Sequence, residues 1–261
     1  MRPPTHLACK SFLAAGVLAA LLGGRAEAQQ LQALPVPPQD WSFRGATGRF
    51  DYASVQRGFA VYSQVCASCH SLRQMTYGDL SSLGLDADQL HDIAASQPVP
   101  AGTDAAGNVV LRAATPGDHF RLPYANEAAA RAANAGALPP DQSRLAGTIQ
   151  GGPSFIQAYL TGFRDTPSSV TLGPGMHYNI YVPGNAIAMP DVLHDAHVRY
   201  TDGTRATTPQ MAHDVSNFLA WVAQPHLEER HRLGIRVLVY LTLLLVLVAV
   251  LKRRVWASVR I

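Results

Sequence analysis

The sequence predicts a mainly α-helical domain with long loops, followed by a single C-terminal transmembrane helix. Two apolar runs frame the domain: a short one at 11–22, and a longer one without any charge at 237–251. Between them, segments with apolar residues at helical spacing alternate with stretches rich in Gly, Pro, Ala and Asp. The sequence has no internal repeat and no βαβ alternation, so a parallel sheet is not expected.

Residues 1–28 have the three parts of a secretory signal peptide. A positively charged start precedes the apolar run at 11–22, and small residues follow up to Ala28. The alternative, a transmembrane anchor, fits less well because this run is short for a bilayer span. We therefore expect cleavage after Ala28 and export of the mature chain, 29–261.

The apolar run at 237–251 is the centre of the predicted membrane helix. Together with 233–236 it is long enough to span a bilayer, and it lacks the polar face of a surface helix. Three basic residues follow it at once, and the positive-inside rule places that end in the cytoplasm. The predicted organisation is an exported domain at 29–229, a juxtamembrane segment and transmembrane helix at 230–254, and a cytoplasmic tail at 255–261.

The charges divide along the same boundary. Residues 29–229 carry eleven arginines, no lysine and seventeen acids, whereas 230–261 carry seven basic residues and no acid. An acidic exported domain argues against nucleic acid as a partner, because phosphate binding requires a basic face. The acidic balance suits a positively charged protein partner, although it also serves simply to keep the domain soluble.

Three segments of the exported domain carry helix signals before its last helix. Residues 51–66 place Phe59, Tyr62 and Val65 on one face. The Ala-rich stretch 126–135 begins with Asn126, a good N-cap. Residues 151–160 form a third, shorter candidate. In contrast, 79–118 and 173–190 show little periodicity, and we expect a long surface excursion and a loop there.

The last helix of the domain has the clearest pattern. Thr208 is predicted as its N-cap with Pro209 in the first helical position, and Pro225 ends it. Its apolar residues recur every three or four positions and predict a buried stripe: Met211, Val215, Phe218 and Val222.

The only two cysteines of the mature chain stand in the motif Cys66-Ala-Ser-Cys69-His70. A redox disulfide would use the same spacing, but normally within a βαβ context that is absent here. Zinc needs four ligands, and neither a second cysteine pair nor clustered histidines supply them. The third interpretation is covalent c-type haem, in which both thiols form thioethers and His70 ligates the iron. An exported, helical domain favours haem.

A haem iron in an electron carrier usually has methionine as its second axial ligand. Met75 is tethered too close to His70, Met211 belongs to the predicted core stripe, and Met176 lies in a glycine-rich turn. Met189 lies in a loop directly before Pro190, which stiffens the chain and helps to fix a thioether in place. Met189 is therefore the favoured ligand, with a histidine as the less favoured alternative.

Four ordered blocks of the sequence resemble the cytochrome c1 family, the haem-bearing subunits of cytochrome bc1 complexes (ubiquinol:cytochrome c oxidoreductases). The blocks are RGFAVYSQVCASCHS at 57–71, ARAANAGALPPDQS at 130–143, YNIYVPGNAIAMPDVL at 178–193, and the last helix with its anchor at 214–251. The second block is far more specific than the cysteine motif. The resemblance covers nearly the whole mature chain.

The resemblance implies a haem domain like that of class I cytochromes c, whose first and last helices cross beside one covalently bound haem c. It implies that Met189 stands at the position of the axial methionine opposite His70. It also implies that Asn134, Pro139 and Pro140 line the haem pocket. No independent catalytic site is expected, because a haem with two protein ligands leaves no open position for a substrate.

The resemblance further implies a role and a set of partners. The chain would take electrons from the Rieske iron–sulfur protein and pass them to a soluble or membrane-bound cytochrome c, within a dimeric complex that contains cytochrome b. It would lie in a bacterial inner membrane with the haem domain on the periplasmic side. Four acids are candidates for docking a basic cytochrome c, or else belong to a solvated loop: Asp79, Asp86, Asp88 and Asp92.

One departure and two alternatives remain. The family usually has an arginine for a haem propionate near the place where Ile149 stands here. Either Arg121, Arg131 or Arg144 compensates for it, or the propionate is less neutralised, which would lower the haem potential. The first alternative function is a membrane-anchored c-type cytochrome that serves an oxidase or dehydrogenase outside the bc1 complex. The second is an anchored thiol–disulfide protein without haem.

Overall fold

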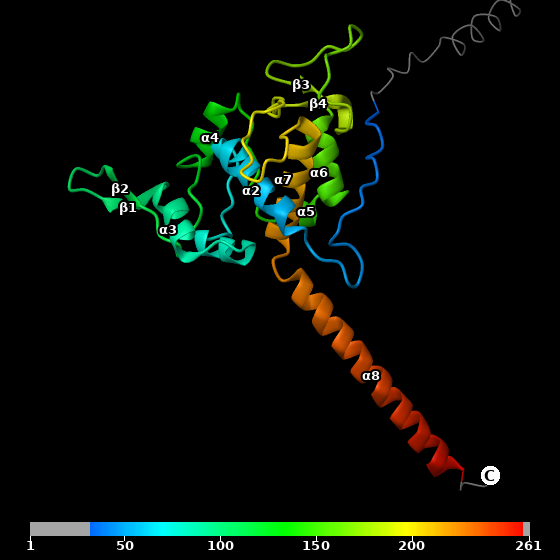
Figure 1. Cartoon of the computed structure of the whole chain (residues 1–261). Coiled ribbons are helices and arrows are strands. Elements are labelled where there is room, and N and C mark those ends of the chain that lie inside the picture. The colour runs from blue at the N-terminus through cyan, green and yellow to red at the C-terminus, as the bar shows by residue number, and fades with distance from the viewer. Residues whose placement is uncertain (1–31, 258–261) are drawn as a thin grey trace, which may run out of the picture. The chain divides into compact units, whose positions relative to one another are not determined.

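A computed structural model describes residues 32–257 of the chain (Figure 1). The predicted signal peptide, 1–28, and the end of the predicted tail, 258–261, lie outside the described residues. The helices are α2 (Tyr52–Gln64), α3 (Ala87–Ala95), α4 (Glu127–Ala133), α5 (Leu145–Thr148), α6 (Gly152–Thr161), α7 (Thr208–Ala223) and α8 (Leu227–Trp256), with 3₁₀ helices η1 (Cys66–Ser68), η2 (Tyr77–Leu83) and η3 (Pro183–Asn185). The strands are β1 (Pro98–Thr103), β2 (Val109–Ala113), β3 (His177–Tyr178) and β4 (Ala186–Ile187).

Helix α2 confirms the predicted first helix and its apolar face. The Asp51 carboxylate caps it by accepting hydrogen bonds from the backbone N–H groups of Ala53 and Ser54. Tyr62 is buried, whereas Phe59 and Val65 are half-buried against the core. The helix ends at Gln64, earlier than the predicted boundary, because Cys66 already begins the tighter turn η1.

Helix α7 confirms the predicted last helix of the domain and its buried stripe. The predicted N-cap was wrong by one position: Thr207 caps the helix, and its hydroxyl accepts from the Gln210 N–H at 3.3 Å. The Thr208 hydroxyl instead bonds to the Leu193 carbonyl at 3.1 Å and ties the preceding loop to the helix start. Almost every side chain from Met211 to Val222 is buried, so α7 is a central helix rather than a surface helix with one apolar face.

Helices α2 and α7 pack against each other in the middle of the domain and cross, as the resemblance implied (Figure 1). Their contact is aromatic, with the Phe218 ring 5.8 Å from the ring centroids of both Phe59 and Tyr62. It is also polar, because the fully buried Asp214 of α7 accepts from Ser54 at 2.7 Å and from Arg57 at 3.0 Å. Burial alone would raise the pKa of Asp214, but hydrogen bonds from His213, Arg57, Ser54 and Gln210 lower it to about 2.

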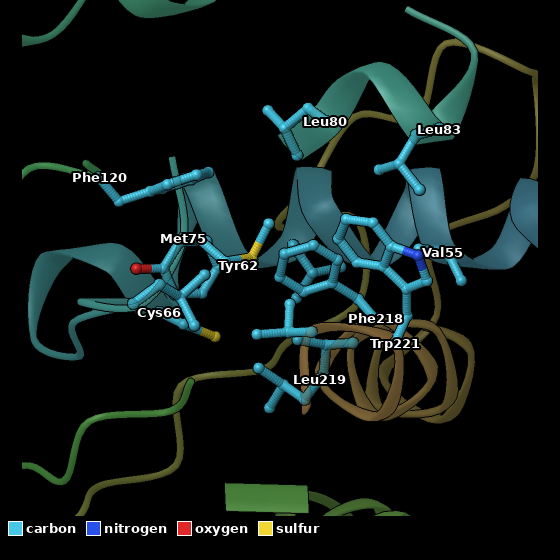
Figure 2. Close-up of a cluster of buried hydrophobic side chains, with 14 of the residues drawn as sticks. Val55, Tyr62, Cys66, Met75, Leu80, Leu83, Phe120, Phe218, Leu219 and Trp221 are labelled. Carbon is cyan, nitrogen blue, oxygen red and sulfur yellow. The ribbon is translucent and has the colours of Figure 1, made fainter. Parts of the chain in front are cut away.

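One apolar cluster extends from this crossing to the cysteine motif (Figure 2). Figure 2 draws Cys66 and Met75 among the aromatic and aliphatic side chains of α2 and α7. Helices α5 and α6 pack against α7 and complete the domain. The predicted helices at 126–135 and 151–160 correspond to α4 and α6, and Asn126 caps α4 as expected.

The stretch 79–118, predicted as a long surface excursion, contains secondary structure that the sequence analysis did not identify. This stretch contains most of η2, all of α3, and an antiparallel hairpin of β1 and β2. Two capping boxes begin these helices, Thr76 with Asp79 and Asp86 with Gln89. Only a few large side chains anchor the stretch to the core, and such a sparse set produces no visible periodicity: Leu80, Leu83, Leu90 and Val99.

The predicted loop at 173–190 is mostly irregular, but the short strands β3 and β4 pair within it. Asn179 and Asn185 stiffen it, because the Asn179 N–H donates to the Asn185 carbonyl and the Asn185 amide donates back to the Asn179 carbonyl, both at 3.0 Å. These two hydrogen bonds close a tight turn a few residues before Met189.

Helix α8 is long and apolar enough to cross a bilayer, and none of its side chains is buried. Its first turns are attached to the domain: Glu228 accepts from the Phe50 N–H at 3.1 Å, and the His231 ring lies 3.1 Å from the Gly48 carbonyl oxygen. The apolar run predicted as a membrane helix therefore continues without a break from the segment that leaves the domain.

The α2–α7 crossing depends on Gly58. A Cβ added there would meet the backbone oxygen of Asp214 and lie 2.6 Å from the Phe218 Cβ. We expect Gly58→Ala to lower the free energy of unfolding by about 2 kcal/mol or more, as overpacking of a core does. Chemical denaturation of the detergent-solubilised protein, followed by circular dichroism, measures this change. Gly117→Ala is the control, because nothing lies within 4 Å of the Cβ it would add; equal effects of the two substitutions would contradict the prediction.

Candidate functional site

The two cysteines end up in different surroundings at the C-terminal end of α2. Both are free thiols; Cys66 is buried in the apolar cluster, whereas Cys69 is half-buried. The turn is closed by the N–H groups of Cys69 and His70, which donate to the Cys66 carbonyl at 3.1 and 2.8 Å. Burial raises the pKa of the Cys66 thiol to about 12. A redox-active thiol needs a low pKa, so this environment disfavours the thiol–disulfide interpretation.

The His70 ring is buried and held in one tautomer. Its Nδ1 lies 2.9 Å from the backbone oxygen of Pro140. A carbonyl oxygen only accepts, so Nδ1 carries the proton and Nε2 keeps its lone pair. Burial lowers the pKa of His70 and keeps the ring neutral at neutral pH. A neutral imidazole whose other nitrogen donates to a carbonyl is the usual state of a metal-ligating histidine.

Residues 70–74 and 140–143 lie side by side and form what we call the Ser71–Asp141 seam. The Asp141 carboxylate accepts from the Ser71 hydroxyl at 2.7 Å and from the Arg73 N–H at 2.9 Å. The backbone is paired as well, because the Gln142 N–H donates to the Ser71 carbonyl at 2.9 Å. The seam fixes the Pro140 carbonyl beside the His70 ring.

The predicted pocket residues act through different groups. Pro140 is exposed, and its contribution to the site is its carbonyl oxygen rather than its ring. Pro139 is half-buried. Asn134, at the end of α4, donates through its amide to the Ala130 carbonyl at 2.7 Å and to the Tyr124 hydroxyl at 3.0 Å.

Tyr124 connects the Asn134 segment to the cysteine motif. Its hydroxyl lies 3.5 Å from the Cys69 sulfur, within hydrogen-bonding distance for sulfur. Sequence reasoning missed this residue, because it lies in an irregular stretch before α4 and 55 positions from Cys69. No spacing or periodic signal in the sequence identifies it.

The methionines of the described residues differ in burial. Met75 and Met211 are buried core residues, at 6% and 0% exposure. Met176 is half-buried in its turn, and Met189 is half-buried against the same cluster that contains Cys66. Among the methionines of residues 32–257, Met189 is thus the one that is partly exposed and also packs against this cluster.

The residues present fit a covalently bound haem. The cysteine motif supplies two free thiols and, directly after them, a neutral imidazole with an available Nε2. Cys66 belongs to the apolar cluster, and the half-buried Met189 packs against the same cluster. Zinc fits less well, since no group of three or more His, Cys, Asp and Glu in metal-binding geometry occurs within 32–257.

The position where the resemblance led us to expect an arginine holds an apolar residue. Ile149 is half-buried and packs against the core cluster. The three arginines considered as substitutes, Arg121, Arg131 and Arg144, are all exposed. Arg131 donates a hydrogen bond to the Gly136 carbonyl at 3.2 Å.

Comparison with known proteins agrees with these observations. The model of the Cytochrome C1 family matches residues 41–259. Cytochrome c1 of Rhodospirillum rubrum is 39% identical over 272 residues, which cover 98% of this chain and 99% of that protein. A mitochondrial cytochrome c1 heme protein of Arabidopsis thaliana is 41% identical over 227 residues, covering 87% of this chain and 74% of the relative.

A longer relative, "Cytochrome b/c1" of Bradyrhizobium diazoefficiens, is 38% identical over 271 residues; these cover 95% of this chain and 39% of that protein. The matches extend over the cysteine motif, the Ser71–Asp141 seam, the loop that contains Met189, and α8. The chain therefore belongs to the cytochrome c1 family.

Proposed function

We propose that this chain is a membrane-anchored cytochrome with one covalently bound haem c, and that it serves as the electron-transfer subunit of a cytochrome bc1 complex. The observation that carries the proposal is the His70 ring, which donates from Nδ1 to the Pro140 carbonyl and keeps Nε2 free, directly after two free thiols. Haem would supply reversible one-electron chemistry at its iron.

Each residue of the site has a distinct role in this proposal. Cys66 and Cys69 would each add their S–H across one vinyl group, a step that transfers the thiol proton to carbon and needs no oxidant. His70 and Met189 would provide the two axial ligands, so that no position is left for a substrate. Pro140 would orient His70 through its carbonyl, and Asn134 and Pro139 would border the pocket.

We propose the Rieske iron–sulfur protein as the electron donor and a soluble or membrane-bound cytochrome c as the acceptor, within a dimeric complex that contains cytochrome b. A relative named "Cytochrome b/c1" supports the association with cytochrome b. The acidic balance of 29–229 supports a basic acceptor. Asp79 and Asp86 are used as helix caps, so exposed Asp88 and Asp92 are the better candidates for docking.

The proposed topology is that of an exported domain on a single membrane anchor. Residues 1–28 would be the cleaved signal peptide, 29–229 the haem domain on the periplasmic side of a bacterial inner membrane, and 230–254 the juxtamembrane segment and span. Residues 255–261 would lie in the cytoplasm. The length of α8 supports this arrangement, as does its apolar run, which is followed by Lys252, Arg253 and Arg254 near the end of the same helix.

The first experiment is a reduced-minus-oxidised visible spectrum of the purified membrane protein, combined with a denaturing gel stained for haem peroxidase activity. We expect an α-band of c type that ascorbate reduces, and a haem-staining band at the mass of this chain. A colourless, unstained band from fully matured protein would overturn the haem proposal. Co-purification with cytochrome b then tests membership of the complex against a cytochrome that serves another oxidase or a dehydrogenase.

Substitution of Met189 should change the ligation of the haem iron without affecting the covalent attachment of haem to the cysteines. We expect Met189→Leu to keep haem covalently bound but to lower its midpoint potential by on the order of 0.1 V or more, because axial ligands tune haem potentials across a range of roughly 0.8 V. A redox titration monitored at the α-band measures the shift. Met176→Leu is the matched control and should leave the potential unchanged. An unshifted potential in Met189→Leu would remove Met189 as the ligand.

Each thiol should be needed for stable attachment. We expect Cys66→Ser and Cys69→Ser to reduce or abolish haem that survives denaturing electrophoresis, because a serine hydroxyl does not form the thioether. The ratio of haem stain to protein stain measures the loss. Ser63→Ala, one turn earlier on α2 and exposed, is the control and should retain the full ratio. Full retention of covalent haem in both cysteine variants would contradict thioether attachment.

A further inference from the structure

We propose that Tyr124 is a positioning residue which donates a hydrogen bond to the Cys69 sulfur and thereby raises the midpoint potential of the attached group. The inference rests on the proposed covalent haem, but it concerns a residue outside the thiols, the axial ligands and the pocket residues considered above. Its basis is a chain of three side chains: Asn134, Tyr124 and Cys69.

The direction of these hydrogen bonds follows from the available protons. The Asn134 amide nitrogen lies 2.7 Å from the Ala130 carbonyl oxygen, which only accepts, so the nitrogen end of the amide is identified. The same nitrogen donates its second hydrogen to the Tyr124 hydroxyl oxygen at 3.0 Å. Tyr124 therefore accepts from Asn134, and its single proton is directed to the Cys69 sulfur at 3.5 Å.

Ser68 is the other hydroxyl near this sulfur, at 3.7 Å. Its proton, however, is better used by the Val65 carbonyl, which lies 2.8 Å from the hydroxyl oxygen. Tyr124 is thus the donor to Cys69. The hydrogen bond to Cys69 also raises the pKa of Tyr124, so the phenol keeps the proton it donates at neutral pH.

The hydrogen bond suits a thioether as well as a thiol. A thioether sulfur has no proton and acts only as a weak acceptor. It is therefore a suitable partner for the Tyr124 hydroxyl, which donates its proton because its oxygen already accepts from Asn134. A donor at the sulfur withdraws electron density from the ring substituent and favours the reduced iron, as hydrogen bonds around redox centres do. Cys66 lies instead in the apolar cluster, so only the sulfur of Cys69 would accept such a hydrogen bond.

The test uses Tyr124→Phe in the full-length protein matured in membranes. We expect covalent haem to be retained and the midpoint potential to fall, because the variant loses the hydroxyl but keeps the ring. Tyr77→Phe is the matched control: its hydroxyl accepts from the Arg121 N–H at 3.1 Å and does not bond to sulfur. The control should leave the potential unchanged. An unchanged potential in Tyr124→Phe would overturn the inference.

A double-mutant cycle tests whether Asn134 acts through Tyr124. Asn134→Ala frees the tyrosine hydroxyl to turn away from the sulfur, so we expect it to lower the potential in the wild-type background. In the Tyr124→Phe background it should produce a smaller shift than in the wild-type background, because the part of its effect that acts through the tyrosine proton is already lost. Fully additive shifts would mean that Asn134 does not direct the tyrosine proton, and would overturn the proposed chain of hydrogen bonds.

A measurement on the unmodified protein covers the case in which Tyr124→Phe fails to mature. Exchange into D2O replaces the phenol proton, so we expect the C–S stretching band in the resonance Raman spectrum of the wild-type protein to shift. An invariant band would overturn the inference without any variant. Absence of covalent haem from the wild-type protein would instead show that the proposed function itself is wrong.

Discussion

The contact between the Pro140 carbonyl and the His70 ring is the interaction on which the rest of the site depends. It selects one tautomer of a buried imidazole and leaves the opposite nitrogen available. The Ser71–Asp141 seam supports this contact by bringing together segments 70 positions apart. Burial would raise the pKa of Asp141, but the hydrogen bonds it accepts from Arg73, Ser71 and Ser143 lower it, so the carboxylate at the centre of the seam remains charged.

The seam is held on one side by the crossing of α2 and α7. This crossing has little freedom, since Gly58 lies against the α7 backbone and the buried Asp214 accepts from Ser54 and Arg57. Breaking a buried ion pair leaves a charge without compensation, which is strongly unfavourable. The turn that carries the cysteines thus starts from a rigid helix, and a site supported by rigid elements keeps its ligands in place.

The two sides of the cysteine motif differ chemically. Cys66 faces an apolar cluster and has a raised pKa, whereas Cys69 is contacted by a hydroxyl that is itself oriented by Asn134. Thiol–disulfide exchange requires a stabilised thiolate, and the surroundings of Cys66 oppose it. An apolar side and a hydrogen-bonded side are compatible with the proposed permanent attachment of a planar group, and the Asn134 amide is connected to Cys69 through Tyr124.

The sequence by itself determined the features that depend on neighbours along the chain. The Cys66–His70 spacing, the stripe of α7, the cap at Asn126 and the charge-free run of α8 are all local patterns. Apolar periodicity gave no helix signal at 79–118, because only a few large side chains anchor this stretch to the core, and the two capping boxes that begin its helices were not recognised. Only the tertiary structure decided that His70 donates to Pro140 and that Tyr124 reaches Cys69. Those contacts join segments 70 and 55 positions apart in the chain, so no local pattern of the sequence determines them.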